Sequence, residues 1–140
     1  LLEIGIEPYM VAPSITAVLG QRLCAKLDDD NKEAFRPNKE MLTGLFDDLS
    51  DIDDLLLYRP TANVVGTPKA YKGRVAIHEL VTVTDEIRAL ISERSSVQEI
   101  ARAAKLVGYK TLRYDALKKA LLGLTTLEEV ERNTSQEWVC

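Results

Sequence analysis

The chain has 140 residues, of which 46% are hydrophobic and 29% are charged, and its formal net charge is −4. This length is typical of one domain with an apolar core, and no run approaches the ~18 to 20 apolar residues that a membrane-spanning helix needs. The two cysteines, Cys24 and Cys140, do not form a disulfide framework, so we expect a reducing, cytoplasmic setting. The start at Leu1, without an initiator methionine, suggests a fragment.

Charge is unevenly distributed along the chain. Between Arg94 and Lys119 there are seven basic and two acidic residues, which gives this segment a net charge of +5 and the remainder −9. The acidic runs at residues 28–30 and 47–54 lack the glycine and the terminal glutamate of a calcium-binding loop. We therefore expect solvated loops or helix faces there. The overall acidity argues against broad nucleic-acid binding.

A first helix is predicted from Pro8 to Leu27. Pro13 suits a first helical turn, and apolar side chains recur at helical spacing after it. This predicted stripe consists of Ile15, Val18, Leu19 and Leu23. A charged stretch follows and extends to Pro37.

The next segment predicts a short helix, a short strand and a turn-rich excursion. Asn38 is a suitable N-cap for a helix that extends to Leu49. Its predicted buried side carries Met41, Leu42 and Leu45. Residues 55–59 predict a brief strand. Residues 60–73 contain two prolines and two glycines, a composition that is typical of turns.

The longest strand signal lies in residues 74–83, where side chains alternate with a period of two. One predicted face consists of Val75, Ile77, Val81 and Val83, and the other of Ala76, His78, Leu80 and Thr82. We expect this strand to pair with residues 55–59 as an antiparallel ribbon.

Four helices are predicted after this strand. Thr84 is an N-cap for the first, with Asp85 and Glu86 in the first turn, where the helix dipole favours negative charge. Capping-box spacing and C-terminal glycines mark the other three. They are Val97–Val107, ended by Gly108, Thr111–Leu122, ended by Gly123, and a short helix that Thr125 or Thr126 opens and that extends to about Asn133. These elements predict an α-rich α+β fold, a helical bundle plus a small antiparallel β-ribbon.

Two polar residues of the predicted strand bear on function. His78 is the only histidine, so no catalytic set with two distinct bases can be completed, and we expect a structural role. Glu79 falls on the predicted apolar face, where an unpaired carboxylate is costly. We expect either a β-bulge that turns Glu79 outward or a cationic partner. The candidates are Arg22, Arg74 and Arg88.

Four segments together are typical of one family. They are GIEPYMVAPSITAVLGQRL at residues 5–23, YKGRVAIHEL at residues 71–80, DEIRALI at residues 85–91 and GYKTLRYDALKKALLGLTTLEEVERNT at residues 108–134. In this order and spacing they resemble the C-terminal portion of the hexameric assembly ATPases of type II secretion systems and type IV pili.

The resemblance implies a parent ATPase whose RecA-like core, upstream of Gly5, binds ATP and Mg²⁺. The phosphate-binding loop of that core is absent here, because Gly66-Thr67-Pro68-Lys69 lacks its glycine spacing and its Lys-Ser/Thr pair. We expect no cofactor and no ATP hydrolysis in this fragment alone. The implied partners are neighbouring protomers of a homohexamer and the inner-membrane platform protein. We expect a cytoplasmic chain, peripheral to the inner membrane, with no membrane insertion and no bound nucleic acid.

Many members of the family carry two CxxC pairs, a spacing that suits a closed structural zinc site. The matching positions here are Asp28, Asn31, Asn63 and Gly66, so the resemblance implies a degenerate, cysteine-free zinc knob. We expect no zinc and apolar packing in its place. The packing side chains would be Leu45, Phe46, Leu55, Leu56 and Leu57. The expected division of the chain is a lead helix in residues 1–27, the knob and β-ribbon in residues 28–83 and a C-terminal helical bundle in residues 84–140.

We expect coupling or structural roles for six residues, four from the resemblance and two, Arg74 and Glu79, from the strand pattern described above. Gln21 and Arg22 match a QRL motif at the base of the helix that leaves the nucleotide core. Arg88 and Glu93 lie in a segment that resembles a helix implicated in coupling the motor cycle to work on the pilus, although a packing helix is an equal alternative. Arg74 and Glu79 complete the set.

An alternative comes from another class of protein. Residues 97–121 have the outline of a helix-turn-helix DNA reader, with a glycine-containing turn and a basic surface. The candidate phosphate or base contacts are Lys110, Arg113, Lys118 and Lys119. The acidic net charge and the family resemblance of the same residues argue against this interpretation.

Overall fold

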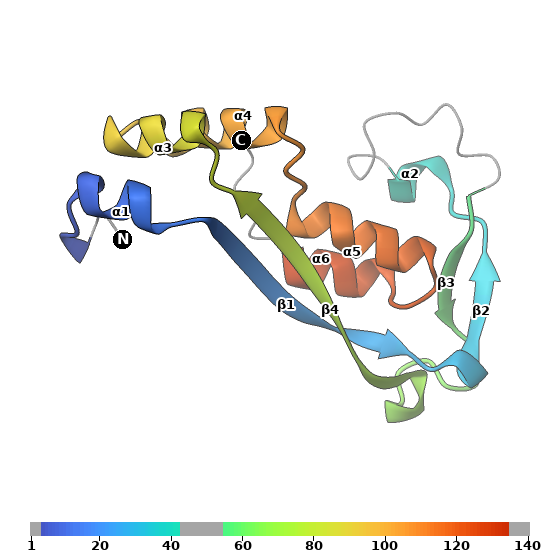
Figure 1. Ribbon diagram of the computed structural model, residues 1–140. Coiled ribbons are helices and arrows are strands. Elements are labelled where there is room, and N and C mark those ends of the chain that lie inside the picture. The colour runs from blue at the N-terminus through green and yellow to red at the C-terminus, as the bar shows by residue number, and fades with distance from the viewer. Residues whose placement is uncertain (1–3, 43–54, 135–140) are drawn as a thin grey trace. The chain divides into compact units, whose positions relative to one another are not determined.

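The computed structural model describes residues 4–42 and 55–134 of the chain. Within these residues it contains six α-helices and two small two-stranded sheets, which confirms the α+β class. The helices are α1 (Pro8–Ser14), α2 (Lys39–Leu42), α3 (Asp85–Ser92), α4 (Val97–Leu106), α5 (Leu112–Leu121) and α6 (Leu127–Thr134) (Figure 1). The strands are β1 (Ala17–Leu27), β2 (Lys32–Phe35), β3 (Leu57–Pro60) and β4 (Tyr71–Thr82).

The sheets pair differently from the predicted ribbon. β4 pairs with β1, and the two strands run in opposite directions in Figure 1. β3 pairs antiparallel with β2, from Lys32 opposite Pro60 to Phe35 opposite Leu57. The predicted pairing of residues 55–59 with the long strand is therefore wrong. The actual partner of β3 is β2, which lies in the charged stretch. Cross-strand contacts stabilise this pair: the Arg59 guanidinium lies 2.8 Å from Glu33 and 5.0 Å from the centre of the Phe35 ring.

The prediction of a helix from Pro8 to Leu27 is wrong after Ser14, where α1 ends. The chain is extended at Ile15 (φ −101°, ψ 123°) and continues as β1. Pro13 removes a backbone donor inside α1, and the β-branched residues that follow it favour a strand. The predicted apolar stripe is largely exposed, at 53% for Val18, 60% for Leu19 and 46% for Leu23.

The described chain forms two compact units, each with its own apolar core. Unit 1 comprises residues 4–20 and 78–111, and unit 2 comprises residues 21–42, 55–77 and 112–134. The backbone therefore crosses between the units after Gly20, after Ile77 and after Thr111. Two boundaries between the units fall inside β1 and β4, so each of these strands runs through both units. The expected division at residues 27 and 83 stays a prediction.

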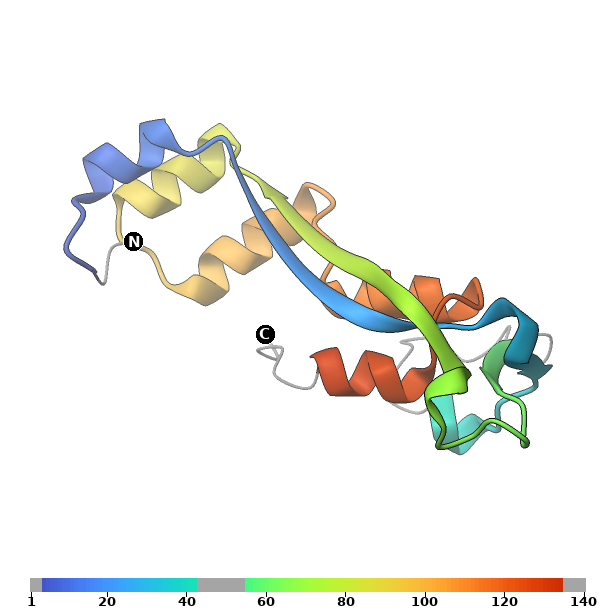
Figure 2. The same ribbon diagram turned by 90° about the horizontal axis from the view of Figure 1, so that it is seen from below.

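In unit 1, α3 packs against both α1 and α4, and Figure 2 shows α1 lying alongside α3. The core consists of Val83, Ile87, Ala103 and Ala104, with Ile15, Val81, Leu90, Ile91, Ile100 and Tyr109 packed around it. The predicted caps are confirmed. The Thr84 hydroxyl accepts from the Ile87 N–H at 3.4 Å, Ser96 and Glu99 form a capping box, and Gly108 ends α4 with φ +91°.

In unit 2, α5 packs against α6 and β3. The core consists of Cys24, Leu42, Leu57, Ile77, Leu112, Ala116, Leu117, Ala120, Leu127 and Val130. The buried residues of α5 are Leu112, Ala116, Leu117 and Ala120. The Asn38 cap is also confirmed, since its side chain accepts from the Met41 N–H at 2.8 Å. The predicted continuation of this helix to Leu49 lies outside the described residues.

The alternation predicted for β4 is confirmed. Ile77 is fully buried and Val75 and Val81 are half-buried, whereas His78, Leu80 and Thr82 are exposed. Ala76, expected on the exposed face, is half-buried.

Candidate functional site

The six candidate coupling residues fall in both units. Glu79, Arg88 and Glu93 belong to unit 1, whereas Gln21, Arg22 and Arg74 belong to unit 2. The side chains of Gln21, Arg74 and Glu93 are exposed, as a surface role requires. Their role in coupling stays a prediction.

Arg88 holds two helices of unit 1 together. Its guanidinium donates to the backbone carbonyls of Ala12 at 3.1 Å and Val83 at 3.4 Å, and it lies 3.4 Å from the Asp85 carboxylate. Ala12 lies in the last turn of α1, where carbonyl groups lack intrahelical donors and favour a cation. The Arg88 side chain is 33% exposed and joins α1 to α3.

Glu79 has a different partner from those expected. It is half-buried on the same face of β4 as Ile77, and its Oε2 accepts a hydrogen bond from the Tyr109 hydroxyl at 2.9 Å. Among the described residues, Glu79 forms no ion pair with Arg22, Arg74 or Arg88, so the predicted cationic partner is wrong. A tyrosine hydroxyl satisfies the carboxylate without the desolvation of a second charge.

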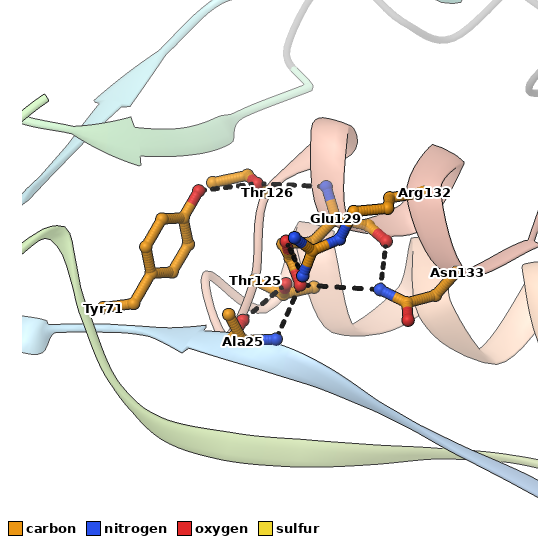
Figure 3. A network of polar contacts seen from close by, with 7 residues as sticks. All are labelled: Ala25, Tyr71, Thr125, Thr126, Glu129, Arg132 and Asn133. Carbon is orange, nitrogen blue, oxygen red and sulfur yellow. Dashed lines mark hydrogen bonds and ion pairs between the residues drawn. The ribbon is translucent and has the colours of Figure 1, made fainter. Parts of the chain in front are cut away.

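A polar network in unit 2 connects α6 to β1, and sequence reasoning missed it (Figure 3). Glu129 is only 6% exposed. Its Oε2 accepts from the Ala25 N–H at 2.7 Å, and its Oε1 lies 2.6 Å from the Arg132 guanidinium. The Thr125 hydroxyl donates to the Ala25 carbonyl at 2.9 Å. Both backbone polar groups of Ala25 are thus paired with side chains at the start of α6.

The same segment continues to cover β1 on either side of Ala25. The Leu27 N–H donates to the Leu124 carbonyl at 2.9 Å, and the Arg22 guanidinium donates to the Asn133 carbonyl at 2.6 Å. Residues 124–133 therefore occupy the edge of β1 where another strand would otherwise pair. An edge covered in this way is protected against pairing with other chains.

The only signal for this network in the sequence is the capping-box spacing at the start of α6. Of the two hydrogen bonds that this spacing predicts, the structure contains one. The Thr126 hydroxyl accepts from the Glu129 N–H at 3.3 Å, which confirms Thr126 as the helix cap. The Glu129 side chain does not return to the cap, because it reaches across to Ala25. Local spacing predicts the start of α6 but not this long-range contact.

Cys24 lies in the core beside this network and is fully buried. Burial raises the pKa of the Cys24 thiol, and the negative charge of Glu129 raises it further. A thiol with a raised pKa stays protonated at neutral pH and is a poor nucleophile. Cys24 is therefore a packing residue and offers no reactive group.

The residues at the four family zinc positions do not fit a zinc ion. Zinc in a structural site needs four thiolate or imidazole ligands, whereas Gly66 has no side chain and the others offer only oxygen and amide groups. The described residues contain no group of three or more potential metal ligands placed to hold an ion. Gly66 instead occupies a turn with φ +75°, a conformation that favours glycine.

Hydrogen bonds connect the two loops that carry these positions. The Asn31 side-chain amide donates to the Asp28 carboxylate at 3.0 Å and to the Lys69 carbonyl at 3.5 Å. The Asn31 carbonyl accepts from the Thr61 N–H at 2.9 Å, and the Thr61 hydroxyl donates to Asn63 at 2.6 Å. The hydrogen bonds from Asp30 and Asn31 also lower the pKa of the Asp28 carboxyl. Of the apolar residues expected to pack here, Leu57 is buried and Leu56 is 43% exposed, while residues 45 and 46 lie outside the described chain.

The stability of these loops is expected to be independent of metal. Asn31→Ala removes the amide that contacts both Asp28 and Lys69, so it should lower the free energy of unfolding by about 1 kcal/mol in urea denaturation. Asp30→Ala, an exposed neighbour, is the matched control and should have little effect. A chelator should leave the melting temperature unchanged. Stoichiometric zinc that survives the chelator would contradict this account.

Comparison with known proteins decides the family. The family model described as Type II/IV secretion system protein matches residues 1–132. The chain belongs to this family. It is 41% identical over 132 residues to the type IV pilus assembly ATPase PilB of Thermus thermophilus, a match that covers 94% of this chain and 15% of the relative.

Two further relatives carry names from type II secretion. The type II secretion system protein E of Xanthomonas campestris is 38% identical over 96% of this chain and 24% of its own length. The type II secretion system ATPase E of Vibrio cholerae is 37% identical over 97% of this chain and 26% of its own length. This member of the Type II/IV secretion system protein family therefore spans about a quarter or less of the relatives that it matches. No helix in its described ranges, 4–42 and 55–134, is long and apolar enough to cross a membrane.

Proposed function

We propose that this chain is the C-terminal coupling portion of a hexameric ATPase that powers type II secretion or type IV pilus assembly. ATP bound and hydrolysed in a preceding nucleotide-binding core would move this portion against neighbouring protomers and against the inner-membrane platform protein. The chain itself would bind neither ATP nor Mg²⁺. The observation that carries the proposal is the family match over residues 1–132, combined with relatives whose names include ATPase and which are several times longer.

The chemistry of the chain supports a role in coupling and not in hydrolysis. The sequence contains no GxxxxGK[ST] motif, whose backbone amides and lysine would bind phosphates and whose hydroxyl would bind Mg²⁺. Its only histidine, His78, lies on the exposed face of β4. A nucleotide site would therefore have to be supplied by another part of the protein.

The division into two units also supports a coupling role. Motors that convert ligand binding into movement need bodies that stay rigid while the connections between them change. Each unit has its own buried core, and within residues 4–42 and 55–134 the backbone crosses between the units three times. In this proposal the surface that carries the exposed residues Gln21, Arg74 and Glu93 would contact protomers or the platform. The protein would act in the cytoplasm, peripheral to the inner membrane.

The helix-turn-helix alternative receives no support. A helix-turn-helix module requires its two helices to pack as one unit. Here α4 belongs to unit 1 and α5 to unit 2, and their buried residues lie in separate cores. The family match covers both helices.

A chimera tests the proposal. This chain replaces the corresponding segment of the T. thermophilus PilB protein, and ATP hydrolysis and ring assembly are compared with those of the intact relative and of the relative without the segment. We expect the chimera to assemble and to hydrolyse ATP, the truncated relative to lose most of this activity, and the 140-residue chain alone to show none. ATP hydrolysis by the chain alone, or a chimera that behaves like the truncated relative, would contradict the proposal.

A further inference from the structure

Three residues of unit 1 lie at the three points where the backbone crosses to unit 2. Gly20 is the last residue of unit 1 before the first crossing. Glu79 is the second residue after the chain re-enters unit 1, and Tyr109 lies two residues before the third crossing at Thr111. Although the three residues are far apart in sequence, Glu79 is in contact with both Gly20 and Tyr109.

The contact between Gly20 and Glu79 requires a glycine. A Cβ atom at position 20 would lie 2.6 Å from Glu79 Oε1 and 2.8 Å from its Cγ, closer than any real Cβ contact. The missing side chain of Gly20 on β1 thus creates the space that the Glu79 carboxylate of β4 occupies. The backbone angle of Gly20 is not the reason for the glycine, since it is not among the described glycines with positive φ.

Tyr109 is held in place by its backbone and its ring as well as by its hydroxyl. Its N–H donates to the Ala104 carbonyl at 3.0 Å, at the end of α4 where Gly108 adopts φ +91°. Its ring packs against the apolar core of unit 1, and its hydroxyl donates to Glu79 Oε2 at 2.9 Å. The Glu79 carboxylate therefore contacts β1 through one oxygen and the end of α4 through the other.

We propose that Gly20, Glu79 and Tyr109 form a clamp that holds the three backbone crossings together on the unit 1 side of a hinge. The pairing of β1 with β4 already connects two of the crossings, and the Tyr109 hydroxyl connects the third crossing to them through Glu79. The contacts of the Glu79 carboxylate hold the three connecting segments in a fixed arrangement at the end of unit 1. A movement of unit 1 would then be transmitted to unit 2 through all three segments together. The clamp deepens the proposed coupling function and gives Glu79 a positioning role within it.

The clamp is tested on the 140-residue chain by pulsed electron spin resonance. Spin labels are attached to cysteines introduced at the exposed residues Gln98 in unit 1 and Lys118 in unit 2, with Cys140→Ser removing the terminal thiol. Cys24 is fully buried and does not react with the label. We expect Tyr109→Phe and Glu79→Ala each to broaden the distribution of distances between the labels. The Tyr109→Phe/Glu79→Ala double variant should be no broader than Glu79→Ala alone, since Glu79→Ala already removes the contact that Tyr109→Phe removes.

Conservative variants separate the clamp from a general loss of stability. Glu79→Gln keeps an acceptor for the Tyr109 hydroxyl and should keep the distribution of the unaltered chain. Tyr9→Phe makes the same chemical change at an exposed tyrosine of α1 and should change nothing. Distributions that coincide with that of the unaltered chain in both Tyr109→Phe and Glu79→Ala would overturn the clamp. The measurement uses no nucleotide, so this result would not contradict the proposed function. The chimera experiment tests the proposed function and does not depend on the clamp.

Discussion

Replacing Glu129 with alanine is expected to lower the free energy of unfolding of unit 2 by about 3 kcal/mol, because a buried donor loses its acceptor and α6 loses its tie to β1. The Ala25 N–H, 2.7 Å from Glu129 Oε2, would have no partner in a region that the side chain shields from water. Loss of the bulky side chain also leaves space between α6 and β1. Urea denaturation followed by circular dichroism measures the change.

Glu128→Ala is the matched control for this variant. Glu128 is the exposed neighbour of Glu129 in the first turn of α6 and makes a similar contribution to the helix dipole. Its replacement should change stability by less than about 0.5 kcal/mol. Glu129→Gln keeps an acceptor for the Ala25 N–H and loses only the ion pair with Arg132, whose side chain is 69% exposed. Its loss of stability should therefore lie between those of Glu128→Ala and Glu129→Ala. Equal effects of Glu129→Ala and Glu128→Ala would show that the network does not stabilise the fold.

Ile77→Ala is expected to cost about 3 to 4 kcal/mol of stability, since it leaves a cavity in a core that cannot fully collapse. Ile77 is fully buried and packs in the same cluster as Cys24, Leu57 and Ala116. It is also the last residue of unit 2 before β4 enters unit 1. A fall in the melting temperature, measured by calorimetry, is the readout.

Leu80→Ala controls for the loss of a large aliphatic residue from the same strand. Leu80 is 53% exposed, so its replacement removes little buried surface and should cost less than about 1 kcal/mol. If both variants melt at the same temperature, the assignment of Ile77 to a packed core is wrong.

The sequence predicted those elements whose signals are local. The caps at Thr84 and Ser96 and the turn at Gly108 are decided within a few residues, and each was predicted correctly. β1 was missed because its apolar residues also match a helical period, and its strand conformation depends on pairing with β4, about fifty residues away in the sequence. The Pro13 and Gly20 positions, unfavourable inside a helix, were the available local signals against it.

The candidate site was less accessible to sequence reasoning. The alternation of β4 placed Glu79 on the buried face and required a partner, which the structure supplies. That partner is Tyr109 because the end of α4 brings a hydroxyl to the carboxylate, and residue spacing carries no information about this contact. Nothing local distinguishes Glu129 from a glutamate that only caps its own helix, so its contact with Ala25 of β1 cannot be predicted from the spacing.

The central claim, that this chain is the coupling portion of a longer ATPase, is tested most directly by the sequence of the natural gene upstream of the codon for Leu1. We expect the preceding ~250 residues, about the size of one to two domains, to contain GxxxxGK[ST] after a predicted strand. A gene that begins near Leu1, with no such motif, would contradict the claim and would make a stand-alone binding module the leading account.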